Sequence, residues 1–205
     1  MPVIVKICGL TNLPDAIGSS EAGADALGFV FYEPSPRYVS IENAAAIMRE
    51  LPPFVVKVGV FVNAPEEMVR RAISECGLNL LQFHGDESPE YCLQFGLMSM
   101  KAFRVSNAAS LARLTDYPTD AWLLDAFSRN QLGGTGEQFN WDLALDAQKL
   151  GRPIFLAGGL TPQNVPDAIR RVRPYAVDVS SGVEAAPGKK DLHQVRAFIR
   201  AAKEA

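Results

Sequence analysis

The chain has 205 residues, of which 48% are hydrophobic and 21% charged, a composition typical of one folded globular domain. Disordered, collagen-like and coiled-coil proteins are thereby excluded. The formal net charge is −3 and no basic cluster occurs, so we expect no nucleic-acid partner. No apolar run reaches the roughly 18 residues of a membrane span, and no signal-peptide pattern is present, so we expect no membrane partner and a cytoplasmic protein.

Cysteine and histidine are scarce. The three cysteines, Cys8, Cys76 and Cys92, form no CxxC pair, which argues against a disulfide framework and a thiolate zinc site. Cys76 and Cys92 fall in helical segments and are interpreted as packing residues. The two histidines, His84 and His193, have no metal-ligand spacing, and we expect His193 on the surface of the last helix. The sequence therefore predicts no metal and no other cofactor.

Short apolar runs rich in β-branched residues alternate with longer amphipathic segments along the whole chain. This alternation is typical of parallel strands joined by crossover helices. The runs predict strands over residues 3–8, 26–31, 55–62, 80–84, 99–103, 122–125, 154–157 and 176–180. The segments 12–14, 40–42, 63–65, 86–89 and 161–162 each place a capping side chain just before a proline or a glutamate, which predicts that helices start there.

Eight strand–helix units of about 26 residues each predict an α/β fold, a compact single (β/α)8 TIM barrel over residues 1–205, although such barrels usually have roughly 250 residues. An open doubly wound sheet is the alternative, but residues 8–12 lack the glycine fingerprint that usually follows its first strand. The glycine-rich stretch 133–136 is too short for a linker and is interpreted as a mobile loop after the sixth strand.

The active site of such a barrel lies at the carboxyl ends of its strands. Cys8, His84, Asp125 and Asp178 lie in or at the ends of predicted strands one, four, six and eight, so they are candidate site residues. Asp25 begins the second strand and is assigned to stability.

Two glycine-bearing turns follow the last two predicted strands. In many barrels this pair of positions binds a phosphate group through backbone N–H groups, although glycines can also simply allow a turn. We interpret the turns as a phosphate site made of Gly158, Gly159, Ser180, Ser181 and Gly182.

A thiol and a carboxyl group are candidates for proton transfer. Cys8 is either a small buried residue or a base, and strand alternation puts Lys6 on the same face, where its charge would favour a thiolate. Asp125 closes an apolar run, where a carboxylate either caps or pairs with a neighbour or takes part in catalysis. An isomerisation needs one acid and one base, which these two residues could supply.

Three further residues have two interpretations each. Asp178 either binds a sugar hydroxyl or pairs with Lys6. Arg37, in a loop stiffened by prolines, is either a solvated charge or a bidentate anchor for a substrate carboxylate. His84 is either a hydrogen-bonded core residue or a ligand contact.

The chain resembles the phosphoribosylanthranilate isomerase family along nearly its whole length. The matching motifs include Lys-Ile-Cys-Gly-Leu-Thr at the start and Asp-Val-Ser-Ser-Gly-Val-Glu near the end. They lie at residues 6–11, 28–31 with 35–38, 58–63, 82–85, 124–125, 133–136, 157–160 and 178–184.

This resemblance implies a (β/α)8 barrel that carries out an Amadori rearrangement in tryptophan biosynthesis without cofactor or metal. The substrate would be a phosphosugar carrying anthranilate, N-(5'-phosphoribosyl)anthranilate. Asp125 would be the general acid, Cys8 the general base, and Arg37 the residue that holds the anthranilate carboxylate. Both monomers and homodimers occur with this architecture.

Other phosphate-binding barrels are weaker alternatives. Indole-glycerol-phosphate synthase would need a catalytic lysine and extra N-terminal residues, and a ribulose-phosphate epimerase would need metal-binding histidines. A bifunctional sugar isomerase of histidine biosynthesis uses two aspartates, whereas the first strand here supplies Cys8. A barrel that only binds a phosphosugar would not need both Cys8 and Asp125.

Overall fold

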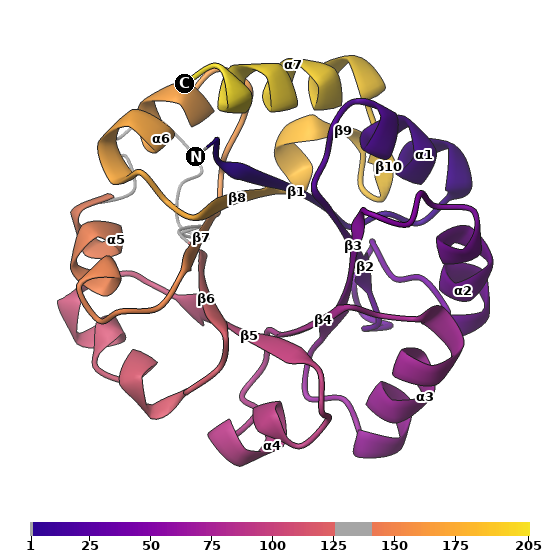
Figure 1. The fold of residues 1–205 in the computed structure, drawn as a ribbon, viewed down its shortest axis with the longest axis horizontal. Helices are drawn as coiled ribbons and strands as arrows, with labels where there is room; N and C mark the ends of the chain where they lie inside the picture. Colours follow the sequence, from indigo (N-terminus) through magenta and orange to yellow (C-terminus); the bar gives the residue numbers. More distant parts are fainter. Residues whose placement is uncertain (1, 126–140) are drawn as a thin grey trace.

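The computed structural model describes residues 2–125 and 141–205, and in it eight parallel strands close into a barrel (Figure 1). Each strand pairs with the next strand along the chain, and β8 pairs with β1. The barrel strands are β1 (Ile4–Cys8), β2 (Ala26–Val30), β3 (Val56–Phe61), β4 (Leu80–Phe83), β5 (Met98–Arg104), β6 (Ala121–Asp125), β7 (Ile154–Ala157) and β8 (Ala176–Val179). The predicted (β/α)8 fold is therefore confirmed, and the open-sheet alternative is wrong.

Helices form a ring around the barrel (Figure 1). In the described residues the α-helices are α1 (Leu13–Glu21), α2 (Ile41–Arg49), α3 (Glu66–Cys76), α4 (Pro89–Leu93), α5 (Trp141–Gln148), α6 (Val165–Val172) and α7 (Leu192–Lys203). None of them is long and apolar enough to cross a lipid bilayer.

The connection between β5 and β6 corrects the expectation of eight strand–helix units. Two short 3-10 helices, η1 (Ala108–Leu111) and η2 (Leu114–Asp116), take the place of a crossover α-helix. Asn107 and Ser110 form a reciprocal capping box at the N-terminus of η1. Pro118 lacks the backbone N–H that a longer helix would require, so the segment ends in an extended approach to β6.

Helices begin within one residue of four of the five predicted segments, and a side chain of the segment caps the helix at three of them. Asn12, Ser40 and Ser88 each accept a hydrogen bond from the backbone of the first turn of α1, α2 and α4. Asn63 does not cap α3, because its side chain instead accepts a hydrogen bond from the backbone N–H of Asp86 at 2.7 Å. Near Thr161 the helix starts later, since α6 begins at Val165.

Apolar side chains pack in two layers, one inside the barrel and one between the barrel and the helices. The inner cluster takes alternate residues of the strands, such as Val58, Met100 and Leu123. Lys6 and Cys8 share this inward parity, because Lys6 lies opposite Ala26 and Cys8 lies opposite Gly28 in the register of β1 with β2. The inward side chains nearest the carboxyl ends of the strands therefore form the floor of any site at that end.

A small hairpin follows β8. The 3-10 helix η3 (Ser181–Val183) leads into β9 (Glu184–Ala186), which pairs with β10 (Lys189–Lys190) before α7 begins. Figure 1 shows this hairpin beside α1. The backbone N–H of Lys190 donates to Asp15 in α1 at 2.7 Å, and the Thr11 hydroxyl donates to the carbonyl of Gly188 at 2.6 Å. The hairpin is thus fastened to the segment that follows β1.

Candidate active site

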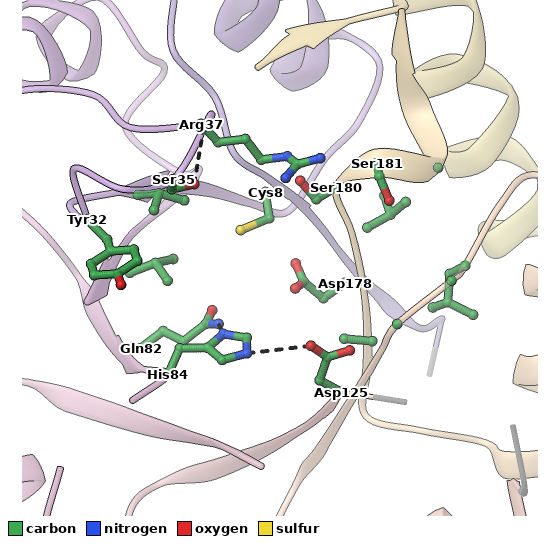
Figure 2. Close-up of a pocket in the computed structure, with 18 of the residues that line it drawn as sticks. Cys8, Tyr32, Ser35, Arg37, Gln82, His84, Asp125, Asp178, Ser180 and Ser181 are labelled. Carbon is green, nitrogen blue, oxygen red and sulfur yellow. Dashed lines mark hydrogen bonds and ion pairs between the residues drawn. The ribbon is translucent and has the colours of Figure 1, made fainter. Parts of the chain in front are cut away.

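A cavity of about 480 Å³ opens at the carboxyl ends of the barrel strands. Figure 2 shows its polar side chains directed toward a common space. All ten predicted site residues line this cavity: Cys8, Arg37, His84, Asp125, Gly158, Gly159, Asp178, Ser180, Ser181 and Gly182. Asp25 lies away from the cavity, where it accepts hydrogen bonds from the backbone of Val5 and from Lys203.

The floor of the cavity holds a buried ion pair between β1 and β8. Lys6 lies opposite Asp178 in the strand register, and its ammonium donates to the carboxylate at 2.8 Å with the Lys6 side chain 0% exposed. A Cβ atom at Gly28 would lie 2.7 Å from the Cys8 sulfur and 3.1 Å from Lys6 Nζ, so only glycine leaves room for both groups. Asp178 therefore pairs with Lys6 and lines the cavity at the same time.

Burial decides the protonation of the Cys8 thiol. Burial raises the pKa of Cys8, the Lys6 ammonium lowers it, and the Asp178 carboxylate raises it again, with a net rise. Lys6 does favour the thiolate, as expected, but its effect on the pKa of Cys8 is smaller than the effect of burial. For Lys6, burial opposes the charge, but Asp178 and Cys8 outweigh it and raise the pKa of the ammonium.

Asp125, at the end of β6, lies near an imidazole on the opposite wall. His84 Nε2 is 3.6 Å from Asp125 Oδ2, which is an ion pair only when the histidine is protonated. Gln82 Nε2 lies 3.1 Å from His84 Nδ1. His84 is partly exposed and lines the cavity, so it is not a core residue, and its contact with a ligand stays a prediction.

Arg37 is held by an acidic side chain from the hairpin. Its Nε and Nη2 donate to the two carboxylate oxygens of Glu184 at 2.8 and 2.7 Å. The Arg37 side chain is 24% exposed and that of Glu184 is 5% exposed. The freely solvated alternative for Arg37 is therefore wrong.

Glu184 also accepts a hydrogen bond from Lys190 at 2.9 Å. Burial raises the pKa of Glu184, but the hydrogen bonds from Arg37 and Lys190 outweigh it and lower the pKa below its ordinary value. The pKa of Lys190 is lowered by burial, which the Glu184 carboxylate only partly offsets. The cations Arg37 and Lys190 and the anion Glu184 thus meet at the rim beside Cys8.

The two glycine turns pack against one another. Gly158 and Gly159 have φ angles of 88° and 65°, which only glycine adopts without strain. A Cβ atom at Gly182 would lie 1.9 Å from the Leu160 carbonyl oxygen, so the turn after β8 requires glycine to reach the turn after β7. The Ser180 hydroxyl is buried in this region and, among the described residues, has no hydrogen-bond partner.

The sequence interpretation missed three polar residues that line the cavity, Tyr32, Ser35 and Gln82, and two that lie behind Arg37, Glu184 and Lys190. Gln82 has the same strand parity as His84, and this alternation was the signal for it. Glu184 and Lys190 follow the second glycine turn, yet no local pattern indicates that their side chains fold back onto Arg37, because that contact joins residues 147 positions apart.

The remaining predictions concern residues outside the cavity. Cys76 and Cys92 are buried, in agreement with their interpretation as packing residues. Burial raises their pKa values to about 11 and about 12. His193 is exposed on α7, as predicted. In the ranges 2–125 and 141–205 no group of three or more His, Cys, Asp or Glu side chains is arranged to hold a metal ion. The predicted loop at 133–136 lies outside the described residues.

Comparison with known proteins agrees with this geometry. A profile of the N-(5'-phosphoribosyl)anthranilate (PRA) isomerase family matches residues 5–201. The N-(5'-phosphoribosyl)anthranilate isomerase of Trichlorobacter lovleyi is 57% identical over 201 residues, which cover 98% of each chain. That of Citrifermentans bemidjiense is 59% identical over 200 residues, covering 98% of this chain and 97% of the relative.

Solved structures give the same result. The crystal structure of phosphoribosyl anthranilate isomerase from Thermotoga maritima superposes with a TM-score of 0.92 and 49% identity, covering 99% of this chain and 100% of that one. A second isomerase structure, in complex with reduced 1-(o-carboxyphenylamino)-1-deoxyribulose 5-phosphate, has a TM-score of 0.90 and 47% identity over the same shares of the two chains. The chain belongs to the N-(5'-phosphoribosyl)anthranilate isomerase family.

Proposed function

We propose that residues 1–205 form one catalytic domain that converts N-(5'-phosphoribosyl)anthranilate to 1-(2-carboxyphenylamino)-1-deoxyribulose 5-phosphate in tryptophan biosynthesis. The observation that carries this proposal is that one cavity contains a thiol from β1 and a carboxyl group from β6, Cys8 and Asp125. Figure 2 shows the two side chains on different walls of the same space. The reaction needs an acid and a base at two different atoms of one sugar, which this separation provides.

Asp125 is the general acid of the first step. Its proton goes to the furanose ring oxygen, the bond from that oxygen to C1' breaks, and the anthranilate nitrogen supplies the electron pair of the resulting Schiff base. His84, whose Nε2 lies 3.6 Å from the Asp125 carboxyl group, faces it from β4 and contacts the substrate there.

Cys8 is the general base of the second step. Its thiolate takes the proton from C2', and the electron pair left behind forms the enolamine, which tautomerises to the ketone. Because burial keeps the pKa of Cys8 high, the thiol gives its proton to solvent, from which Asp125 regains one for the next turnover, only with help from nearby positive charge. Lys6 supplies one such charge, and the cationic Schiff base of the first step supplies a second.

The substrate has an anionic group at each end, a phosphate and a carboxylate, and the two groups bind at different parts of the cavity rim. The phosphate binds at the turns after β7 and β8, where the Ser180 hydroxyl, which has no hydrogen-bond partner within residues 2–125 and 141–205, provides a donor beside the glycine backbone. The carboxylate binds at Arg37 by a bidentate contact. Asp178 remains paired with Lys6 and faces the sugar.

The proposal is tested by following the loss of anthranilate-type fluorescence when purified protein is mixed with fresh N-(5'-phosphoribosyl)anthranilate. A chelator is present throughout, and the product, which has the same mass as the substrate, is separated from it by chromatography and identified by its ketone. Rapid, complete conversion that is unaffected by the chelator is the expected result. No conversion, or conversion restored only by added metal ions, would refute a mechanism carried by Cys8 and Asp125 alone.

A further inference from the structure

The contact between Glu184 and Arg37 gives the hairpin after β8 a part in substrate recognition. Glu184 lines no wall of the cavity, but its carboxylate accepts from both Nε and Nη2 of Arg37. We propose that Glu184 is a positioning residue, which fixes the plane of the Arg37 guanidinium so that its outer edge receives the substrate carboxylate. This inference rests on the proposed function.

The donor groups of the guanidinium support this role. An arginine has five N–H groups in a fixed plane, and Glu184 takes one from Nε and one from Nη2. The three N–H groups that remain, two on Nη1 and one on Nη2, form a second fork along the end of the side chain. That fork matches the two oxygens of a carboxylate, so one edge of Arg37 is fixed by the protein and the other is left for a ligand.

Three loops meet around Glu184 and Arg37. A Cβ atom at Gly188 would lie 2.9 Å from the carbonyl oxygen of Pro36, so the hairpin packs directly on the Arg37 loop. A Cβ atom at Gly9 would lie 2.6 Å from Arg37 Cδ and 2.9 Å from Ser180 Oγ, which places the arginine stem against β1 and β8. The stem of Arg37 is therefore confined on the side of Gly9.

The charges around Glu184 indicate what its neutral isostere would do. Lys190 donates to Glu184 at 2.9 Å and to the Ser180 carbonyl at 3.2 Å, with its side chain 0% exposed. In Glu184→Gln the shape is kept, but one amide oxygen must replace two carboxylate oxygens and the amide N–H groups face the donors of Arg37. The guanidinium then loses its bidentate partner and is repelled by the Lys190 ammonium, so its outer edge is no longer directed at the ligand.

The test measures binding of two ligands by calorimetry. One is reduced 1-(o-carboxyphenylamino)-1-deoxyribulose 5-phosphate, and the other is the same molecule without the carboxylate. Glu184→Gln should weaken binding of the first ligand roughly tenfold, as expected for losing the alignment of one charged hydrogen-bonded pair, and should leave the second nearly unchanged. Glu21→Gln, an exposed acid at the end of α1, is the matched control and should alter neither.

A double variant separates positioning from simple support of the fold. In an Arg37→Ala background, Glu184→Gln should cause no further loss of affinity, because Glu184 acts through Arg37. Equal weakening of both ligands, or an unchanged affinity of Glu184→Gln for the first, would overturn this inference alone. Wild-type protein that neither binds the first ligand nor converts the substrate would overturn the proposed function together with it.

Discussion

At the scale of single residues, the protonation of Cys8 is set by opposing contributions. Burial and the Asp178 carboxylate raise its pKa, and Lys6 does not fully offset them. With Cys76 and Cys92 replaced by alanine, the rate of reaction of Cys8 with a small thiosulfonate should rise with pH to a midpoint above the ordinary value of 9.0. A midpoint below 9.0 would contradict the assigned direction of the pKa shift.

Arg37 gives a second prediction at this scale. Removing its guanidinium removes a contact that the substrate and the transition state share, because the anthranilate carboxylate lies away from the reacting carbon atoms. Arg37→Ala should therefore raise KM roughly tenfold to a hundredfold and lower kcat much less, as steady-state kinetics would show. A loss confined to kcat would place Arg37 in the proton-transfer steps instead.

Residues with short-range signals were predictable, and those whose roles depend on distant contacts were not. Strand parity placed Lys6 beside Cys8, and the interpretation that Asp178 pairs with Lys6 is confirmed, whereas its contact with a sugar hydroxyl stays a prediction. Glu184 carries no such signal, because its function depends on a loop that lies 147 positions earlier in the chain.

At the scale of elements, apolar runs located every barrel strand to within one residue at each end, because buried parallel strands are nearly continuous runs of apolar residues. Helix starts were less predictable, since a polar side chain before a proline can bond elsewhere, as Asn63 does with Asp86.

Ser40 tests the capping argument. Ser40→Ala should lower the free energy of unfolding by about 1 kcal/mol, since its hydroxyl accepts from the Asn43 backbone at the start of α2. Ser74→Ala is the control, because this exposed serine lies inside α3, where alanine is the better helix former. Urea denaturation of the two variants should give clearly different midpoints, and equal midpoints would contradict the assigned cap.

Because Glu184 lies in the hairpin of β9 and β10, the free energy of unfolding should fall when the pH becomes acidic. The pKa of Glu184 is lower in the folded chain than its ordinary 4.5, so its contribution to stability is complete above about pH 4.5 and is lost as pH falls through the folded value. The stability difference between wild type and Glu184→Gln should therefore be largest at neutral pH and shrink at pH 3.5. A difference that grows on acidification would reverse the assigned sign.

At the scale of the whole molecule, the buried ion pair of Lys6 and Asp178 links β1 to β8, the two strands that close the barrel. Asp178→Asn leaves the Lys6 ammonium buried without its counter-ion and should lower the free energy of unfolding by about 3–5 kcal/mol. Replacing both residues by apolar ones, Lys6→Met with Asp178→Leu, should recover most of that loss. Asp116→Asn, at an exposed position, should leave stability unchanged.

The closed barrel also brings Cys8 on β1 and Asp125 on β6 to one cavity. The central claim is that Asp125 acts as the general acid and Cys8 as the general base. The most direct test compares single-turnover conversion by wild type, Cys8→Ala and Asp125→Asn, each after its affinity for the reduced product analogue has been measured. Cys92→Ala and Asp116→Asn are the matched controls. We expect wild-type affinity in both site variants with turnover reduced at least about a thousandfold, consistent with loss of a general acid or base. Near-wild-type turnover by either site variant would contradict it.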